Sequence, residues 1–124
     1  QSRWEKVQVK PGAALPPHSR GYLIPGYEYN GTPLYLSEFG GIAYIPEGVK
    51  VPESAWGYAG VEPSQQAALE RLRGLYQAIR NSPFIGICYT QITDVEQEIN
   101  GLMTYGRKLK FDPKEIKKLN DMLR

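Results

Sequence analysis

Two apolar runs stand out along the chain, and each ends in polar or acidic residues. Residues 33–36 and 84–89 are almost wholly apolar and are bounded by turn-forming residues. Such runs are typical of strands buried on both faces, as in a parallel sheet. Between them, residues 63–81 repeat apolar side chains at helical spacing. The order strand, loop, helix, strand predicts a βαβ unit, whose two strands run parallel.

Local signals place the ends of two helices. The first begins near Pro63 and Ser64 and ends at the turn residues 81–83. Its apolar stripe consists of Ala68, Leu69, Leu72, Leu75, Tyr76 and Ile79. Asp112 is the predicted N-cap of a second helix. That helix should bury Ile116, Leu119 and Leu123 and expose Lys114, Lys117 and Lys118.

Two stretches lack regular periodicity. Residues 1–32 are rich in proline and glycine. Within them residues 4–9 alternate weakly, and they are either a short strand or the end of an element that belongs to sequence outside this chain. Residues 42–61 form a long loop that carries Trp56 and Tyr58. Loops of this length inside a compact domain are usually functional or disordered, and the aromatic pair favours a functional one.

The parallel arrangement predicts where the candidate functional side chains lie. Glu38 closes the first apolar run and precedes Gly40 and Gly41, which permit a sharp turn or close contact with a ligand. Residues 89–94 close the second run with hydrogen-bonding and acidic groups. Ligands of parallel sheets collect at the carboxyl ends of the strands, so Glu38 and residues 89–94 are predicted neighbours. The alternative is a Glu38 that only caps a turn.

Composition narrows the chemistry to carboxylates. Cys88 is the only cysteine and His18 the only histidine among the 124 residues, which excludes within this chain an internal disulfide, a histidine triad and a multi-histidine zinc site. We expect Cys88 to be a small buried residue of the second strand. We expect no metal and no cofactor. A net charge of +2 does not indicate nucleic acid, and no apolar run is long enough to span a membrane.

Two segments resemble the end of a family 2 glycoside hydrolase catalytic domain. They are Ser-Glu-Phe-Gly-Gly at residues 37–41 and the stretch at 88–102 that begins Cys-Tyr-Thr-Gln-Ile-Thr-Asp, followed by a basic stretch at 107–110. The family contains β-galactosidases, β-glucuronidases and β-mannosidases. The resemblance covers most of the chain, from about residue 21 to the last helix.

The resemblance implies an α/β fold, the C-terminal part of a (β/α)8 TIM barrel that contributes its last two strand–helix units. Residues 1–124 would then be a C-terminal fragment of the catalytic domain, the last quarter or third of a larger protein. Glu38 matches the catalytic nucleophile of retaining hydrolysis. The acid/base of the family follows an asparagine, as Asn-Glu, and this pair does not occur here. We therefore expect the chain alone to be inactive.

The resemblance also implies substrate-binding roles, each with a structural alternative. Trp56 either stacks on a sugar ring or lies under its loop, and for Tyr58 we favour the second arrangement. Tyr89 and Gln91 either bind the sugar or are satisfied within the loop. Asp94 binds hydroxyls or a cation, or braces the loop. For Glu96 and Glu98 we favour structural roles.

The substrate class follows from a departure from the family pattern. β-Glucuronidases carry Asn-x-Lys where this chain has Glu98-Ile99-Asn100, and an acidic residue there would repel a uronate. A neutral β-glycoside, with β-galactoside first, is the expected substrate. The other expected partner is the remainder of the barrel or, for the isolated chain, a second copy. We favour a periplasmic or secreted location over a cytoplasmic one, and the location stays open.

Two other functions remain open from sequence alone. One is a carbohydrate-binding or structural module that has lost catalysis. The other is a small α/β interaction domain with a closed core of its own, whereas a fragment should leave apolar faces exposed.

Overall fold

The computed structural model describes residues 29–123 and contains the predicted βαβ unit. Strand β1 (Leu34–Gly40) pairs in parallel with β4 (Phe84–Thr90), and α1 (Gln65–Arg80) lies between them in sequence. The short strands β2 (Ala43–Tyr44) and β3 (Val61–Glu62) form a second parallel pair. Helix α2 (Pro113–Asp121) closes the chain. The predicted strand at residues 4–9 and His18 lie outside the described residues.

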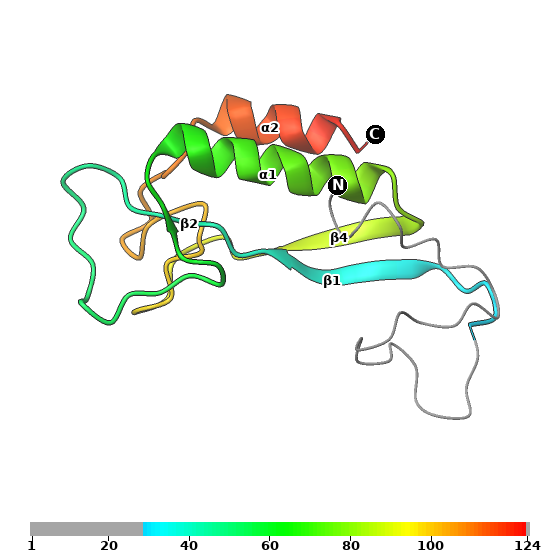
Figure 1. Ribbon diagram of the computed structural model, residues 1–124, viewed down its shortest axis with the longest axis horizontal. Coiled ribbons are helices and arrows are strands. Elements are labelled where there is room, and N and C mark those ends of the chain that lie inside the picture. Colours follow the sequence, from blue (N-terminus) through cyan, green and yellow to red (C-terminus); the bar gives the residue numbers. More distant parts are fainter. Residues whose placement is uncertain (1–28, 124) are drawn as a thin grey trace.

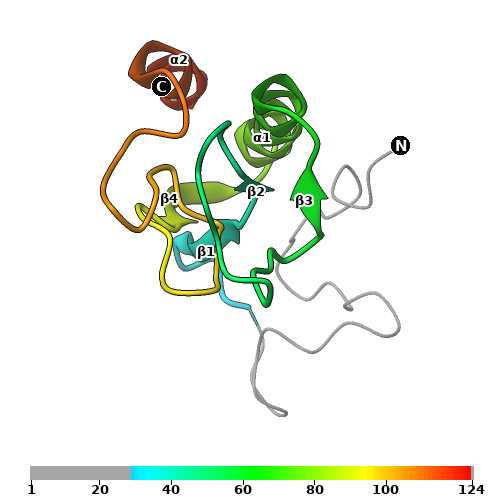
Figure 2. The ribbon, with the colours of Figure 1, turned by 90° about the vertical axis from the view of Figure 1, so that its left-hand side faces the viewer.

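The two helices lie side by side over one face of the β1–β4 sheet (Figures 1 and 2). The predicted Asp112 cap of α2 is confirmed, because its carboxylate accepts a hydrogen bond from Lys114 N–H. The predicted start of α1 near Pro63 and Ser64 is also confirmed, and the Ser64 hydroxyl caps the helix by accepting a hydrogen bond from Ala67 N–H. The predicted stripe of α1 is buried except for the half-buried Leu75. Leu119 is the buried residue of α2.

The core lies between the sheet and the helices. Its buried members are Ile42, Ala68, Leu69, Leu72, Tyr76, Phe111 and Leu119. Phe39 of β1 joins them, with its ring centroid 5.4 Å from that of Tyr76 in an edge-to-face contact. Tyr76 also links the helices, because its hydroxyl donates to Asn120 Oδ1 of α2 at 2.8 Å.

Both strands are less buried than the apolar runs predicted. Tyr35 of β1 is 60% exposed and Ile85 of β4 is 73% exposed, since the helices cover only one face of the sheet. The expectation that Cys88 is buried is wrong, because its side chain is exposed. The described residues therefore form one covered sheet face and one face without a covering layer.

The loops that follow β1 and β4 gather at the carboxyl ends of these strands, on the left of Figure 1. Gly41 N–H donates to Thr90 O at 2.8 Å, which joins the two loops where the strands end. None of the helices in residues 29–123 has the length and apolar character needed to cross a membrane.

Candidate functional site

Glu38 lies near the carboxyl end of β1 with an exposed side chain. One of its carboxylate oxygens, Oε1, accepts a hydrogen bond from the Tyr58 hydroxyl at 3.0 Å. Among the described residues, neither a lysine nor an arginine forms an ion pair with Glu38. The side chain is thus an accessible carboxylate held through one oxygen by a neutral donor.

Tyr58 reaches Glu38 because Gly41 leaves room for its ring. Gly41 has a φ of +65°, and a Cβ built there would lie 2.1 Å from Tyr58 Cδ2. Only glycine combines this left-handed backbone conformation with such close contact. The glycine that follows the strand therefore determines where the tyrosine lies.

Trp56 and Tyr58 form an exposed aromatic pair beside Glu38. Their ring centroids are 5.6 Å apart, with planes tilted by 42°, and the side chains are 40% and 54% exposed. The prediction that Tyr58 lies tucked under its loop is wrong, because the ring is exposed and its hydroxyl contacts Glu38. The sequence signal for this was the i, i+2 spacing, which places both aromatic side chains on the same side of an extended segment.

The aromatic loop is fastened to the loop that follows β4. Trp56 N–H donates to Gln97 O at 2.8 Å, and Ile99 N–H donates to Trp56 O at 3.0 Å. Asn100, which is fully buried, lies under Gly57 and donates from Nδ2 to Glu98 Oε1 at 3.2 Å. The two loops, far apart in sequence, therefore act as one support for Tyr58 and Glu98.

Two carboxylates act on the Tyr58 hydroxyl. The hydrogen bond to Glu38 raises the pKa of Tyr58 above its usual 10.0, and desolvation and the negative charges of Glu38 and Glu98 act in the same direction. A hydrogen bond with Thr90 opposes them. Tyr58 is therefore protonated, and able to donate, throughout the neutral range.

Tyr89 packs against the ends of the two strands. Its ring would collide with a Cβ at Gly40, packs edge-to-face on Phe39 at 5.5 Å, and its hydroxyl donates to Asn100 O at 3.2 Å. Burial raises the pKa of Tyr89 well above 10.0. These contacts are those of a packing residue that supports the strand ends.

Asp94 is buried, and its carboxylate is hydrogen-bonded within the protein. Its Oδ1 accepts hydrogen bonds from Lys110 Nζ at 3.0 Å and from Gly101 N–H at 2.8 Å. Lys110 Nζ also donates to Ile99 O at 2.8 Å, and the lysine side chain has no exposed area. Burial lowers the pKa of Lys110, while the hydrogen bond and charge of Asp94 oppose that shift. The geometry favours loop bracing over sugar binding for Asp94.

Gln91 and Glu96 differ in burial. Gln91 is half-buried, and its Nε2 is buried and has no hydrogen-bond partner among residues 29–123. Glu96 is exposed. Of the five predicted site residues, the structure brings Glu38 and Trp56 together through Tyr58, and sets Tyr89 and Asp94 into the supporting layer.

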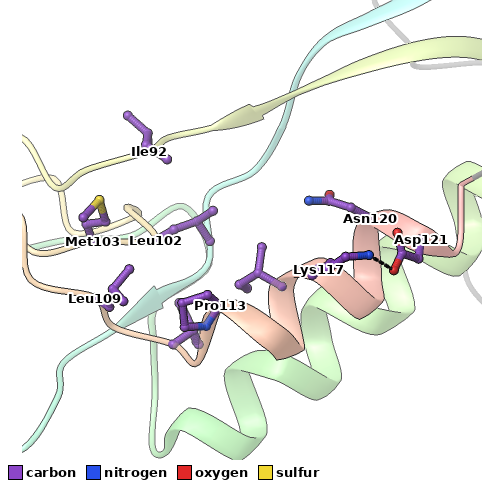
Figure 3. A pocket seen from close by; sticks show the side chains of 10 residues that line it. Ile92, Leu102, Met103, Leu109, Pro113, Lys117, Asn120 and Asp121 are labelled. Carbon is purple, nitrogen blue, oxygen red and sulfur yellow. Dashed lines mark hydrogen bonds and ion pairs between the residues drawn. The ribbon is translucent and has the colours of Figure 1, made fainter.

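A separate hollow of about 310 Å³ lies between α2 and the loop that follows β4 (Figure 3). Ile92, Leu102, Met103 and Leu109 line it on the loop side, and its polar side chains all come from α2. None of the predicted site residues lines it. Within residues 29–123, no group of three or more His, Cys, Asp or Glu residues is arranged to hold a metal ion.

Comparison of the sequence with models of known protein families and with curated proteins found no match.

Proposed function

We propose that this chain is part of a retaining glycoside hydrolase in which Glu38 is the nucleophile. The observation that carries the proposal is the place of Glu38: an accessible carboxylate at the carboxyl end of a parallel strand, 3.0 Å from a tyrosine donor and beside an exposed aromatic pair. Catalytic groups of parallel α/β folds occupy this end of the sheet.

The chemistry assigned to Glu38 is a double displacement. One carboxylate oxygen forms a bond to the anomeric carbon as the glycosidic C–O bond breaks, and the leaving oxygen keeps that electron pair and takes a proton from a second carboxyl. Water then attacks the anomeric carbon, gives its proton back to the second carboxyl, and releases Glu38. The two carboxyl groups must lie about 5 to 5.5 Å apart. We assign the second carboxyl to a part of the barrel outside this chain, so the isolated chain is expected to be inactive.

The aromatic pair supports a carbohydrate substrate. Sugar rings present C–H patches that pack on aromatic faces, and Trp56 is 40% exposed next to Tyr58. A neutral β-glycoside, β-galactoside first, suits a site in which neither Glu38 nor Glu98 forms an ion pair with a described lysine or arginine.

The uncovered sheet face supports a fragment of a barrel over a self-contained interaction domain. Tyr35 and Ile85 are 60% and 73% exposed, and β1 and β4 form a sheet of two strands within the described residues. An isolated pair of strands is marginal in water, and exposed edges and apolar faces seek neighbours. The proposed neighbour is the remainder of the barrel, with self-association expected for the chain alone.

Covalent trapping tests the proposal. The longest natural protein that contains this chain is incubated with 2-deoxy-2-fluoro glycosyl fluorides of galactose, glucose and mannose, and adducts are located by peptide mass spectrometry. We expect an adduct on Glu38, with the galactosyl reagent fastest. Glu38→Gln should abolish labelling, whereas the matched control Glu47→Gln, which changes an exposed loop glutamate, should leave it unchanged.

A second candidate is a carbohydrate-binding module without catalysis. The exposed Trp56–Tyr58 pair favours it, because stacking on a sugar requires no nucleophile. A folded protein that binds galactosides but gives no adduct with any of the three reagents would establish this candidate and rule out the hydrolase.

A further inference from the structure

The Glu38 carboxylate is held unevenly. Its Oε1 accepts the Tyr58 hydroxyl at 3.0 Å, whereas Oε2 accepts no hydrogen bond from the described residues. A nucleophilic carboxylate needs one oxygen free and oriented toward the reacting carbon. The single tyrosine contact fixes the carboxylate without occupying both oxygens.

Tyr58 is itself fixed from three directions. Its ring lies against the backbone of Gly41, where a Cβ would come within 2.1 Å of the ring. The Trp56 ring lies beside it at 5.6 Å. The two backbone hydrogen bonds of Trp56 to the loop after β4 hold the segment that carries both rings. A hydroxyl placed this firmly loses little further freedom when it binds the carboxylate.

We propose that Tyr58 is a positioning residue for Glu38: its hydroxyl anchors Oε1 and thereby aims the free oxygen, Oε2, at the anomeric carbon. This inference rests on the proposed hydrolase function and adds a residue to it. Tyr58 acts through Glu38 and requires no contact with the substrate.

The charges around Tyr58 agree with this role. A tyrosine that positions a carboxylate has to remain protonated, and Glu38 and Glu98 both favour the neutral phenol. Glu98 is held in place by Asn100 Nδ2 at 3.2 Å, so its charge stays near the hydroxyl. The donor is therefore secured by the same loop that fixes its position.

The test measures the rate of trapping by 2-deoxy-2-fluoro-β-galactosyl fluoride in the longest natural protein containing the chain. Fluoride leaves without help from a general acid, so the inactivation rate reports attack by Glu38, while the reagent's inhibition constant reports binding. We expect Tyr58→Phe to lower the maximal inactivation rate about 10- to 100-fold, the range for a hydrogen bond to a charged group. The inhibition constant should change by less than about threefold, since phenylalanine keeps the aromatic ring that can pack on a sugar and removes only the hydroxyl.

Tyr105→Phe is the matched control. Tyr105 is 68% exposed, and no hydrogen bond from its hydroxyl is present among the described residues. It should trap reagent at the wild-type rate, and circular dichroism should show both variants folded. Equal inactivation rates for wild type and Tyr58→Phe, with Glu38 labelled in both, would overturn the inference and leave the hydrolase intact. No labelling of the wild type would remove the hydrolase and the positioning role together.

Discussion

Replacing Lys110 by methionine is expected to destabilise the loop that follows β4 by about 3–5 kcal/mol. The lysine side chain has no exposed area, and its Nζ binds Asp94 Oδ1 at 3.0 Å and Ile99 O at 2.8 Å. Hydrogen bonds to charged groups contribute about 1.5–3 kcal/mol each, so two of them give about 3–6 kcal/mol, which covers that range. The variant leaves the buried Asp94 carboxylate with Gly101 N–H as its remaining donor in the described part of the chain.

Urea unfolding of the longest natural protein containing the chain measures this loss, and hydrogen exchange in peptides covering residues 91–111 locates it. Lys108→Met is the matched control, because Lys108 is exposed and its side chain forms no ion pair within the described residues. The double variant Asp94→Asn with Lys110→Met should recover part of the loss, since no buried charge is left unpaired. A Lys110→Met protein that unfolds like the Lys108→Met control would refute the assignment of the pair as the brace of this loop.

Two further outcomes follow from the strand ends. Gly41→Ala should slow trapping at Glu38, because the new Cβ would lie 2.1 Å from the Tyr58 ring. Gly48→Ala is the control, because Gly48 has a similar φ of +74° and nothing within 4 Å, so that variant should carry only the backbone strain. Equal trapping rates for the two variants would contradict the contact between Gly41 and the Tyr58 ring. Tyr89 has a folded-state pKa raised by burial, so the stability it supports is complete below pH 10.0, the ordinary tyrosine pKa, and falls as pH rises above it. Tyr89→Phe should flatten that alkaline decline in thermal unfolding measured between pH 9 and about 11, and an unchanged slope would count against its burial.

Local signals predicted the elements well. The stripe of α1, its start near Ser64 and the Asp112 cap follow from spacing and from hydrogen bonds within a few residues. The parallel β1–β4 pair follows from the order strand, helix, strand. The prediction that the carboxyl ends of the two strands lie side by side is also confirmed, since Phe39 pairs with Tyr89 and Gly40 with Thr90. The predictions on barrel, sugar and nucleophile stay predictions.

The roles of individual polar residues were harder to predict. Asp94 and Lys110 stand 16 positions apart, and neither the spacing nor the composition indicated that they form a buried pair. Tyr58 was assigned to packing because its i, i+2 spacing from Trp56 indicates that the two rings share one side of the segment but not that this side meets Glu38. Cys88 was assigned to the interior because an apolar run was taken to be covered on both faces, and only one face has a covering layer here.

The sequence by itself determined which segments become helices and strands, which way the strands run, and that Glu38 stands at a strand end. These properties depend on side-chain periodicity and on caps within one turn, and both can be read along the chain. Only the tertiary structure decided that the Tyr58 hydroxyl contacts Glu38 and that Asp94 forms a buried ion pair with Lys110. The physical reason is that hydrogen bonds between distant loops depend on where the backbone places each side chain, to within a few tenths of an ångström. Gly41, by leaving space for one ring, decides which tyrosine reaches the carboxylate.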